Sequence, residues 1–396
     1  MPGFIIQLFM NCHLRSGPYK NIVFHTPEKQ YEPFIELISQ QSSIQTQTAG
    51  LNNTRINILM TGAGAPGAPG IIHCLLQEPS FTVIAADKDS QATGRYLTHD
   101  FVQIPEAGDP DFIHTVLQVC RDKNIDIILP LVTRELSRLA SSKKAFEKEG
   151  IRVVVSGTDV IEIVNNKSAC YQFLNNEGIR VPEHRIVHSV EEFIHAAFEL
   201  GHPKRSFCFK PSVSNGSRGM RIVSDSLDES EMLFNAKPYN INITYAHAIH
   251  ILSSKPFPEL LLSEYLPGAE YSIDCIADHG KPVVIVPRSR LKMVNGISVQ
   301  GEFVKDETII HYCRQIIEAT GLHGNAGIQI KMNEAHEPLL LEINPRVQGT
   351  IVAALGAGIN LPLLAIKQEL GETIDAGKLE IKWGTRFSRY WTEVYY

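Results

Sequence analysis

The sequence predicts an α/β first domain followed by an α+β second part. In the first domain, apolar runs alternate with helical patterns, as parallel strands require because each crossover between them needs a dozen or more residues. In the second part, neighbouring apolar runs are joined by short turns, for example 278–281 (DHGK), which is typical of antiparallel strands. The length of 396 residues, with 43% hydrophobic and 20% charged residues, allows two or three folded domains.

The first domain is expected over residues 56–165. Its strand-like runs are INILM, FTVIAAD, IDIILPLV and RVVVS, at 56–60, 81–87, 125–132 and 152–156. Helical patterns are expected at 70–78, 110–122, 134–149 and 158–165. This alternation predicts a mostly parallel sheet. The preceding residues 1–55 end in a stretch rich in Gln, Ser, Thr and Asn, so we expect an N-terminal extension and linker.

The second part begins with a helix over 167–178 that ends on a glycine suited to a helix C-terminus. A second helix, with Ser189 as its N-cap, precedes a strand over 206–212. The segment 235–257 has no clear period and is expected to be a loop or insertion. Beyond it, antiparallel strands are expected at 260–268, 269–278, 281–292, 326–333 and 338–346, with a helix over 306–321 among them.

Bulk composition excludes several classes of protein. The net charge is −6 and no long run carries one sign, so we expect neither a nucleic-acid partner nor a membrane partner. No apolar stretch reaches the roughly 18 residues of a membrane span. The seven cysteines are scattered singly, and the N-terminus lacks the basic residue and cleavage site of a signal peptide. These features predict a cytoplasmic protein.

A glycine-rich turn, TGAGAPGAPG at 61–70, follows the first strand. It fits the dinucleotide-binding pattern G-x-G-x-x-G at Gly62, Gly64 and Gly67, and Asp87 ends the next strand. However, Pro66 and Pro69 have no N–H to offer a pyrophosphate. We therefore expect a strand-to-helix turn that borders an interdomain cleft, with Asp87 as an ordinary acid at a strand end.

Candidate metal ligands lie on two neighbouring strands near the C-terminus. Glu342 and Asn344 are two residues apart and therefore share one face of a strand. The turn NEAHE brings Gln329 opposite position 341 or 342. One carboxylate and two amide oxygens suit a hard cation such as Mg²⁺, and Arg346 adds a fork for phosphate or carboxylate. The alternative is that Glu342 is a lone carboxylate on an exposed strand.

Two further clusters could bind a nucleotide. Lys210 ends an apolar strand and is followed by a loop of small residues, Gly216, Ser217 and Gly219, whose N–H groups could approach phosphate oxygens. An ordinary hairpin would have the same composition. Glu264 and Glu270 flank a Leu-Pro-Gly turn and could accept hydrogen bonds from a sugar or an amino group, although lone acids of this kind are usually solvated.

In chain order these clusters resemble the ATP-grasp superfamily, most closely its carbamoyl-phosphate-synthase-like branch, over about residues 56 to 390. The resemblance implies a pre-ATP-grasp, Rossmann-like parallel sheet followed by two α+β subdomains that clasp the nucleotide. The implied domains are 56–165, a small subdomain with its lid at 166–262, and a C-terminal subdomain with the metal site at 263–396. The chain departs from the family at Ser214, where relatives often carry glycine.

The resemblance also implies a ligand for each cluster. Phosphates of ATP are implied for Lys167, Lys210, Ser217 and Gly219. Adenine and ribose are implied for Glu264, Tyr265, Leu266 and Glu270. Mg²⁺, with Mn²⁺ as a substitute, is implied for Gln329, Glu342 and Asn344. The transferred phosphoryl group or the acceptor is implied for Arg346.

The activity implied is that of an ATP-dependent ligase. It would phosphorylate a small-molecule carboxylate, or bicarbonate, and couple the acyl phosphate to an amine or ammonia, with Lys210, Arg290 and Arg346 as the catalytic residues. Arg290 is chosen because relatives carry a basic residue near it that binds substrate. Arg288 and Lys292 would share its strand face, or would be solvated charges on an edge strand. Dimers are common among members of this family, so the resemblance leaves open whether this protein is a homodimer.

Two other functions compete with the ligase. One is an oxidoreductase that binds NAD(P) at the glycine turn, although nothing after residue 166 resembles a hydride-transfer site. The other is an ATP-binding relative without turnover, although both lysines and the whole metal site are present. The identity of the carboxylate and the amine does not follow from the sequence.

Overall fold

The computed structural model describes residues 55–396 except 215, 217 and 236–240. The chain divides into the units Met1–Asn53 and Thr54–Tyr396, and only the second is described here. The expected N-terminal extension at 1–55 therefore lies almost wholly outside the described residues. Within those residues, no helix is both long and apolar enough to cross a bilayer.

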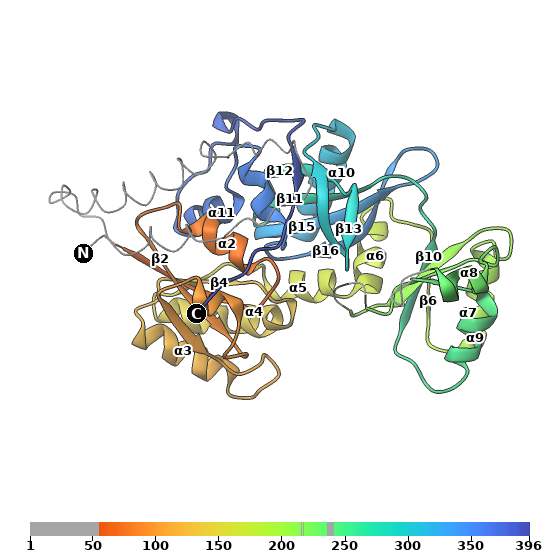
Figure 1. The fold of residues 1–396 in the computed structure, drawn as a ribbon, viewed down its shortest axis with the longest axis horizontal. Coiled ribbons are helices and arrows are strands. Elements are labelled where there is room, and N and C mark those ends of the chain that lie inside the picture. The colour runs from red at the N-terminus through yellow and green to blue at the C-terminus, as the bar shows by residue number, and fades with distance from the viewer. Residues whose placement is uncertain (1–54, 215, 217, 236–240) are drawn as a thin grey trace, which may run out of the picture. The chain divides into compact units, whose positions relative to one another are not determined.

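The first sheet has five parallel strands in the order β3-β2-β1-β4-β5 (Figure 1). Its strands are β1 (Ile56–Thr61), β2 (Phe81–Asp87), β3 (Asp100–Gln103), β4 (Ile127–Pro130) and β5 (Arg152–Val153). Its helices are α2 (Ala68–Leu75), η3 (Thr93–Tyr96), α3 (Phe112–Asp122), α4 (Thr133–Lys148) and α5 (Thr158–Asn165). The parallel sheet and the four helices expected from the sequence are confirmed, whereas β3 was not anticipated because its residues DFVQ carry only a weak apolar pattern.

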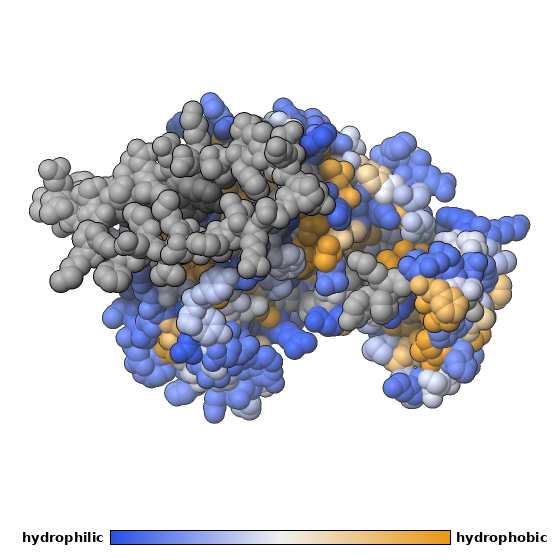
Figure 2. Space-filling view, viewed as in Figure 1, coloured by the Kyte–Doolittle hydropathy of each residue, from blue (hydrophilic) through white to orange (hydrophobic). Residues whose placement is uncertain are grey.

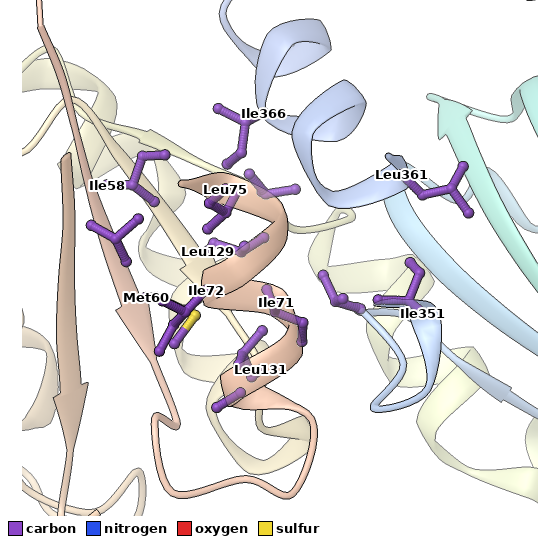
Figure 3. Packing of buried hydrophobic residues seen from close by; sticks show 14 of the residues in the cluster. Ile58, Met60, Ile71, Ile72, Leu75, Leu129, Leu131, Ile351, Leu361 and Ile366 are labelled. Atoms are coloured by element: carbon purple, nitrogen blue, oxygen red, sulfur yellow. The ribbon is translucent and has the colours of Figure 1, made fainter. Parts of the chain in front are cut away.

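Side chains of β1 alternate between two cores. Ile58 and Met60 pack with Ile71, Ile72 and Leu75 of α2, whereas Leu59 points into a separate core on the other face of the sheet. The α2 core also includes Ile351, Leu361 and Ile366 from the C-terminal part (Figure 3). The first sheet is therefore joined to the C-terminal part by shared apolar burial, which holds the glycine turn before α2 against that part.

Gly67 marks the closest approach at this junction. A Cβ atom at Gly67 would lie 2.4 Å from the Cα of Gly349, a backbone atom that cannot rotate away. We expect Gly67→Ala to lower the free energy of unfolding by about 1–3 kcal/mol, because the two backbones must separate. Urea denaturation measures this change. Gly108→Ala is the matched control, since a Cβ there meets nothing within 4 Å. Equal stability of the two variants would contradict the close packing.

The second sheet has the order β6-β10-β7-β8-β9. It consists of β6 (His184–Val187), β7 (Phe207–Pro211), β8 (Arg221–Val223), β9 (Asn242–Ile243) and β10 (Leu260–Glu264), and all pairs are antiparallel except β8 with β9. The helices α7 (Val190–Glu199), α8 (Glu229–Phe234) and α9 (Tyr245–Leu252) belong to this part of the chain, whereas α6 (Lys167–Asn176) packs in a core shared with the third sheet and α10. The Ser189 hydroxyl accepts from the Glu192 N–H, as expected of the N-cap of α7.

The expectation of a loop or insertion over 235–257 is wrong for β9 and α9, which lie between 242 and 252, and residues 236–240 lie outside the described residues. The Thr244 side chain caps α9 by accepting from the His247 N–H. Ala248 is buried, and Tyr245, Ile249 and Leu252 pack on the same core. These four positions have the i, i+3, i+4, i+7 spacing of a helix, a pattern hidden in the sequence by the histidines between them.

The third sheet is antiparallel in the order β12-β11-β15-β16, as expected. It contains β11 (Glu270–Asp278), β12 (Lys281–Ser289), β15 (Gly324–Met332) and β16 (Pro338–Asn344), with α10 (Glu307–Thr320) between β14 and β15. A small sheet, β13-β14-β17, is built from β13 (Lys292–Val294), β14 (Ile297–Glu302) and β17 (Arg386–Ser388). The remaining elements are η4 (Ile351–Leu355), α11 (Leu361–Glu369) and η5 (Ala376–Lys378).

The β13–β14 hairpin carries apolar side chains into solvent. Figure 2 shows apolar surface where Figure 1 labels β13, and Leu291, Met293 and Val294 are exposed there. A cavity of about 60 Å³ adjoins this hairpin, lined by Pro66, Val294, Asn295, Ile297, Val299, Arg389, Tyr390 and Trp391. The glycine turn, the hairpin and the C-terminal segment thus enclose one mostly apolar space.

Candidate active site

Glu342, Gln329 and Asn344 meet on neighbouring strands of the third sheet. Gln329 pairs directly with Glu342 across β15 and β16, which confirms the register expected from the turn. The Asn344 amide donates to Glu342 Oε1 at 3.1 Å, so these two side chains share a face. The alternative of a lone carboxylate on an exposed strand is wrong, because Glu342 is half-buried and hydrogen-bonded. The three side chains offer oxygen ligands at one place.

Arg346 extends this group toward the first sheet. Its Nη2 donates to Asn344 Oδ1 at 3.2 Å, and its Nε donates to the Thr133 hydroxyl at the start of α4 at 2.9 Å. Burial lowers the pKa of the guanidinium, and the charge of Glu342 opposes this change. Thr133 gave no signal in the sequence, because it is a single hydroxyl more than 200 residues away. The guanidinium is thus positioned by a group from α4 and a group from β16.

Lys210 lies on β7 of the second sheet and reaches the third. Its Nζ donates to the Leu341 carbonyl of β16 at 2.8 Å and lies 5.5 Å from the centre of the Tyr171 ring. Burial lowers the pKa of Lys210 to about 8, with the nearby positive charge of Lys167 acting in the same direction and Glu342 opposing it. Lys210 therefore stands beside the carboxylate of Glu342 in a site that penalises charge.

Lys167 approaches the same carboxylate from the first turn of α6. It is 7% exposed, and its Nζ donates to the Ser214 carbonyl at 2.6 Å. Burial lowers the pKa of Lys167, and the charge of Glu342 again opposes the change. Among the described residues, neither Lys167 nor Lys210 forms an ion pair with a carboxylate within 4.0 Å; both amines bind backbone carbonyls. The structure thus brings both lysines to the group around Glu342.

The loop after β7 carries glycines in a left-handed conformation. Gly219 has φ +77°, and a Cβ there would lie 2.7 Å from Pro211 Cδ, so only glycine fits without strain. Gly216 has φ +64°. Ser217, also expected in this loop, lies outside the described residues. Ser214, where relatives often have glycine, supplies the carbonyl that Lys167 binds.

Glu264, the last residue of β10, is followed by Tyr265 and Leu266. Glu264 accepts the Glu183 N–H at 2.9 Å, which fixes its carboxylate beside β6. The Lys331 ammonium lies 4.8 Å from the centre of the Tyr265 ring, and Leu266 is buried. These three residues are consecutive at the end of one strand, and Lys331 is a neighbour that the sequence did not indicate.

Glu270 and Arg290 form an ion pair that the sequence did not predict. Glu270 Oε1 lies 3.0 Å from Arg290 Nε. The guanidinium also donates to the Ser272 hydroxyl at 3.0 Å and to the Gly296 carbonyl at 2.7 Å. Burial lowers the pKa of Arg290, and the Glu270 carboxylate opposes this. The resemblance implied the ribose of ATP for Glu270 and the acceptor substrate for Arg290, and the structure places the two residues in contact.

The expectation that Arg288 and Lys292 share one strand face is wrong. Arg288 and Lys292 do not lie on one continuous strand, because β12 ends at Ser289 and β13 begins at Lys292. The alternative of a solvated charge is also wrong for Arg288, which is 1% exposed and donates from Nε to Asp274 Oδ2 at 2.7 Å. Lys292 is exposed. The signal missed was Asp274, an acid inside the apolar run of β11.

The glycine turn after β1 is held by Asp87, the acid at the end of β2. Asp87 Oδ2 accepts the Gly64 N–H at 2.7 Å, and Oδ1 accepts the Asp89 N–H at 2.9 Å. Both carboxylate oxygens therefore hold backbone groups of the first domain. This arrangement favours the interpretation of Asp87 as an ordinary acid at a strand end.

Two family models match parts of the chain. Residues 256–388 match a model described as ATP-grasp in the biosynthetic pathway with Ter operon, and residues 58–154 match a PylC-like N-terminal domain. The carbamoyl phosphate synthase large chain of Pseudothermotoga lettingae is 24% identical over 85% of this chain and 30% of its own length. The corresponding chain of Neisseria gonorrhoeae is 27% identical over 82% of this chain and 31% of its own. The chain thus spans about a third of these relatives.

Solved structures share the fold at low sequence identity. N5-carboxyaminoimidazole ribonucleotide synthetase in its ADP complex has a TM-score of 0.63 at 14% identity, covering 83% of this chain and 80% of its own. Biotin carboxylase from Campylobacter jejuni, complexed with β,γ-ATP, has a TM-score of 0.61 at 16% identity, covering 84% and 75%. The L-amino acid ligase of Bacillus licheniformis has a TM-score of 0.57 at 16% identity, covering 83% and 77%.

Proposed function

We propose that this chain is an ATP-dependent carboxylate–amine ligase, because an ATP-grasp model and a PylC-like N-terminal model match parts of it and a solved synthetase shares its fold. It phosphorylates a small-molecule carboxylate, or bicarbonate, and couples the product to an amine or ammonia. The observation that carries this proposal is the position of two buried amines: Lys210 Nζ binds the carbonyl of Leu341, the residue before Glu342, and Lys167 Nζ binds the Ser214 carbonyl in the loop after β7. Phosphate-binding cations thus lie near an oxygen-ligand site.

The nucleotide side of the site follows from charge. Lys167 and Lys210 neutralise ATP phosphate oxygens, and the loop with Gly219 brings backbone N–H groups to them. The residues after β10 and Glu270 take adenine and ribose. Such a role for Glu270 requires it to share its carboxylate with Arg290.

The donor set of Glu342, Asn344 and Gln329 fits Mg²⁺, and also Mn²⁺, because a carboxylate and two amide oxygens are hard ligands. In the structure, the amide nitrogen of Asn344 donates to Glu342, and the amide oxygen accepts from Arg346. A bound Mg²⁺ would neutralise negative charge on the phosphate oxygens of ATP.

The transfer needs positioning rather than a covalent catalyst. A carboxylate oxygen attacks the γ-phosphorus of ATP, the bond to ADP breaks, and an acyl phosphate forms. The amine then attacks the acyl carbon, loses a proton, and releases inorganic phosphate. Lys210 and Arg346 stabilise the charge that develops on the phosphoryl group, and Arg290 helps to hold the acceptor.

Two alternatives receive less support. An NAD(P) oxidoreductase would need the glycine turn to bind a pyrophosphate, but Gly67 is packed on the Gly349 backbone and the Gly64 N–H is bound to Asp87. A non-catalytic ATP-binding protein would not need to keep every charged and metal-binding side chain of the site.

The described cysteines carry free thiols, which favours a reducing compartment such as the cytoplasm.

Nucleotide binding separates the ligase from the oxidoreductase. MgATP at about 100 times its Kd is expected to stabilise the protein by about 2.7 kcal/mol, because a ligand that binds only the folded state adds RT ln(1 + [L]/Kd). Thermal-shift measurements with MgATP, NADH and NADPH give the comparison. Stabilisation by NADH or NADPH without stabilisation by MgATP would refute the ligase.

Turnover separates the ligase from a non-catalytic binder. ADP release should appear only when a carboxylate and an amine are added together, or a carboxylate alone where the acyl phosphate hydrolyses. Bicarbonate, amino acids and other small carboxylates are the acceptors to screen. Tight ATP binding with no acceptor-dependent ADP release would favour the non-catalytic alternative.

Lys210 gives the affinity for ATP a pH dependence. Only its cationic form attracts phosphates, and burial lowers the pKa of Lys210 to about 8. The Kd for MgATP should therefore be lowest below about pH 8 and rise by up to about tenfold per pH unit above it. Titrations across this range in the wild type and in Lys210→Gln test this expectation. Retention of the same transition in Lys210→Gln would contradict the assignment.

A further inference from the structure

A group of metal-ligating side chains lies apart from the active site. Asp278 ends β11, His279 follows it in the turn to β12, and His323 lies in the connection between α10 and β15. Among the described residues, this is the one place where three such groups bring ligand atoms within 4.8 Å of one another. Glu270 begins the strand that Asp278 ends, so the group is separated from the Glu270–Arg290 pair by about 26 Å of extended chain.

The spacing of the three side chains is close to that of a tetrahedral site. Asp278 Oδ1 lies 3.5 Å from His323 Nδ1 and 4.0 Å from His279 Nε2. The two imidazole rings are stacked, with centroids 4.0 Å apart and planes 12° from parallel. Ligand atoms bound to one Zn²⁺ at 2.0–2.2 Å lie about 3.3–3.6 Å apart, which is near the two distances from Asp278. The exposed ring of His279 has to turn out of the stack so that its nitrogen and that of His323 point at one ion.

His323 is held in place as metal-bound histidines are. It is 6% exposed, its backbone N–H and carbonyl both bind the Ser156 hydroxyl, and its Nε2 lies 2.7 Å from Glu369 Oε2. A carboxylate behind one ring nitrogen fixes the tautomer and directs the other nitrogen to a metal. That other nitrogen, Nδ1, faces Asp278 and has only the His279 N–H at 3.4 Å as a hydrogen-bond partner.

The local charge balance accommodates a cation. The carboxylates of Asp278 and Glu369 face the two histidines, and one ammonium, that of Lys143, lies 3.4 Å from the second oxygen of Glu369. Glu369 thus stands between Lys143 and His323.

We propose that Asp278, His279 and His323 bind a divalent transition-metal ion, of which Zn²⁺ is the best match, with water completing the coordination. Imidazole and carboxylate ligands together select Zn²⁺ over Mg²⁺. The ion ties the β11–β12 turn to the connection before β15, and through Glu369 to α11. This site is independent of the proposed ligase activity and serves the fold rather than the reaction.

Metal titration of the full chain, stripped of metal and free of ATP, tests the site. The probes are Zn²⁺ in calorimetry and Co²⁺ by the visible absorption of its tetrahedral complex. The wild type should bind one equivalent of Zn²⁺ or Co²⁺. The variant Glu342→Gln should still bind this equivalent, and the variant His279→Gln should not. His279 is chosen because its side chain is 73% exposed, so the variant should fold. His336→Gln is the control, since His336 is another exposed turn histidine with positive φ.

Glu369→Gln tests the supporting carboxylate. It should keep the equivalent of Zn²⁺ but bind it about 10- to 100-fold more weakly, because the carboxylate only positions His323. The proposal would be overturned if the wild type formed no tetrahedral Co²⁺ complex, or if His279→Gln bound a full equivalent of Co²⁺. Loss of the equivalent in Glu342→Gln instead would place the metal in the active site and would also overturn it.

Discussion

Glu342→Gln is expected to lower acceptor-dependent ADP release by about a thousandfold, because it removes the one carboxylate of the proposed metal site. The substitution keeps the size of the side chain and its half-buried place opposite Gln329, so the thermal midpoint should stay close to that of the wild type. Steady-state ADP release at saturating MgATP and thermal unfolding of the same preparation provide the two readouts.

Glu334→Gln is the matched control for this substitution. Glu334 is exposed in the turn that joins β15 to β16, eight positions before Glu342 in the chain. It removes the same charge from the same hairpin and should leave turnover unchanged. Full activity in Glu342→Gln would refute the metal assignment, and an equal loss in both variants would attribute the effect to the net charge of the hairpin.

Arg288→Met is expected to lower the free energy of unfolding by about 3–5 kcal/mol, because it leaves the buried Asp274 carboxylate without its partner. Arg288 and Asp274 are 1% and 0% exposed, and their ion pair spans neighbouring strands of the third sheet. Asp274 Oδ1 and Arg288 Nη1 lack hydrogen-bond partners among the described residues, so the pair is only partly satisfied. Urea denaturation measures the loss.

The double variant Asp274→Leu/Arg288→Met removes both charges and should recover most of the stability, since a buried ion pair can be replaced by apolar side chains at little cost. Arg314→Met, on the exposed face of α10, should change stability by no more than about 0.5 kcal/mol. A double variant that is no more stable than Arg288→Met would show that the loss comes from packing around Arg288 rather than from the uncompensated charge.

Most of the fold could be predicted from local patterns in the sequence. The β1 strand, the Ser189 N-cap and the pairing of Gln329 with Glu342 depend on alternation, capping and turn length, which are properties of neighbouring residues. Helix α9 shows how such a pattern is missed: its apolar residues have helical spacing, but histidines lie between them and the segment before them gives no signal.

Contacts between distant segments could not be read in the same way. The hydrogen bond of Arg346 to Thr133 joins the segment after β16 to α4, and that of Lys210 to the Leu341 carbonyl joins two sheets; no local pattern encodes either partner. The burial of Arg288 was misjudged because a charged residue near a strand end is normally solvated. Only the acid within β11 could have suggested a buried pair.

The central claim is that ATP phosphorylates a carboxylate, and oxygen-isotope transfer tests it most directly. An acceptor identified by the ADP-release screen is labelled with ¹⁸O in its carboxylate, and the inorganic phosphate released in turnover is analysed by mass spectrometry. Attack of the carboxylate on the γ-phosphorus places one labelled oxygen in each phosphate when the acyl phosphate is cleaved at its carbon. Phosphate that carries oxygen only from ATP and water would contradict an acyl-phosphate intermediate and with it the proposed ligase.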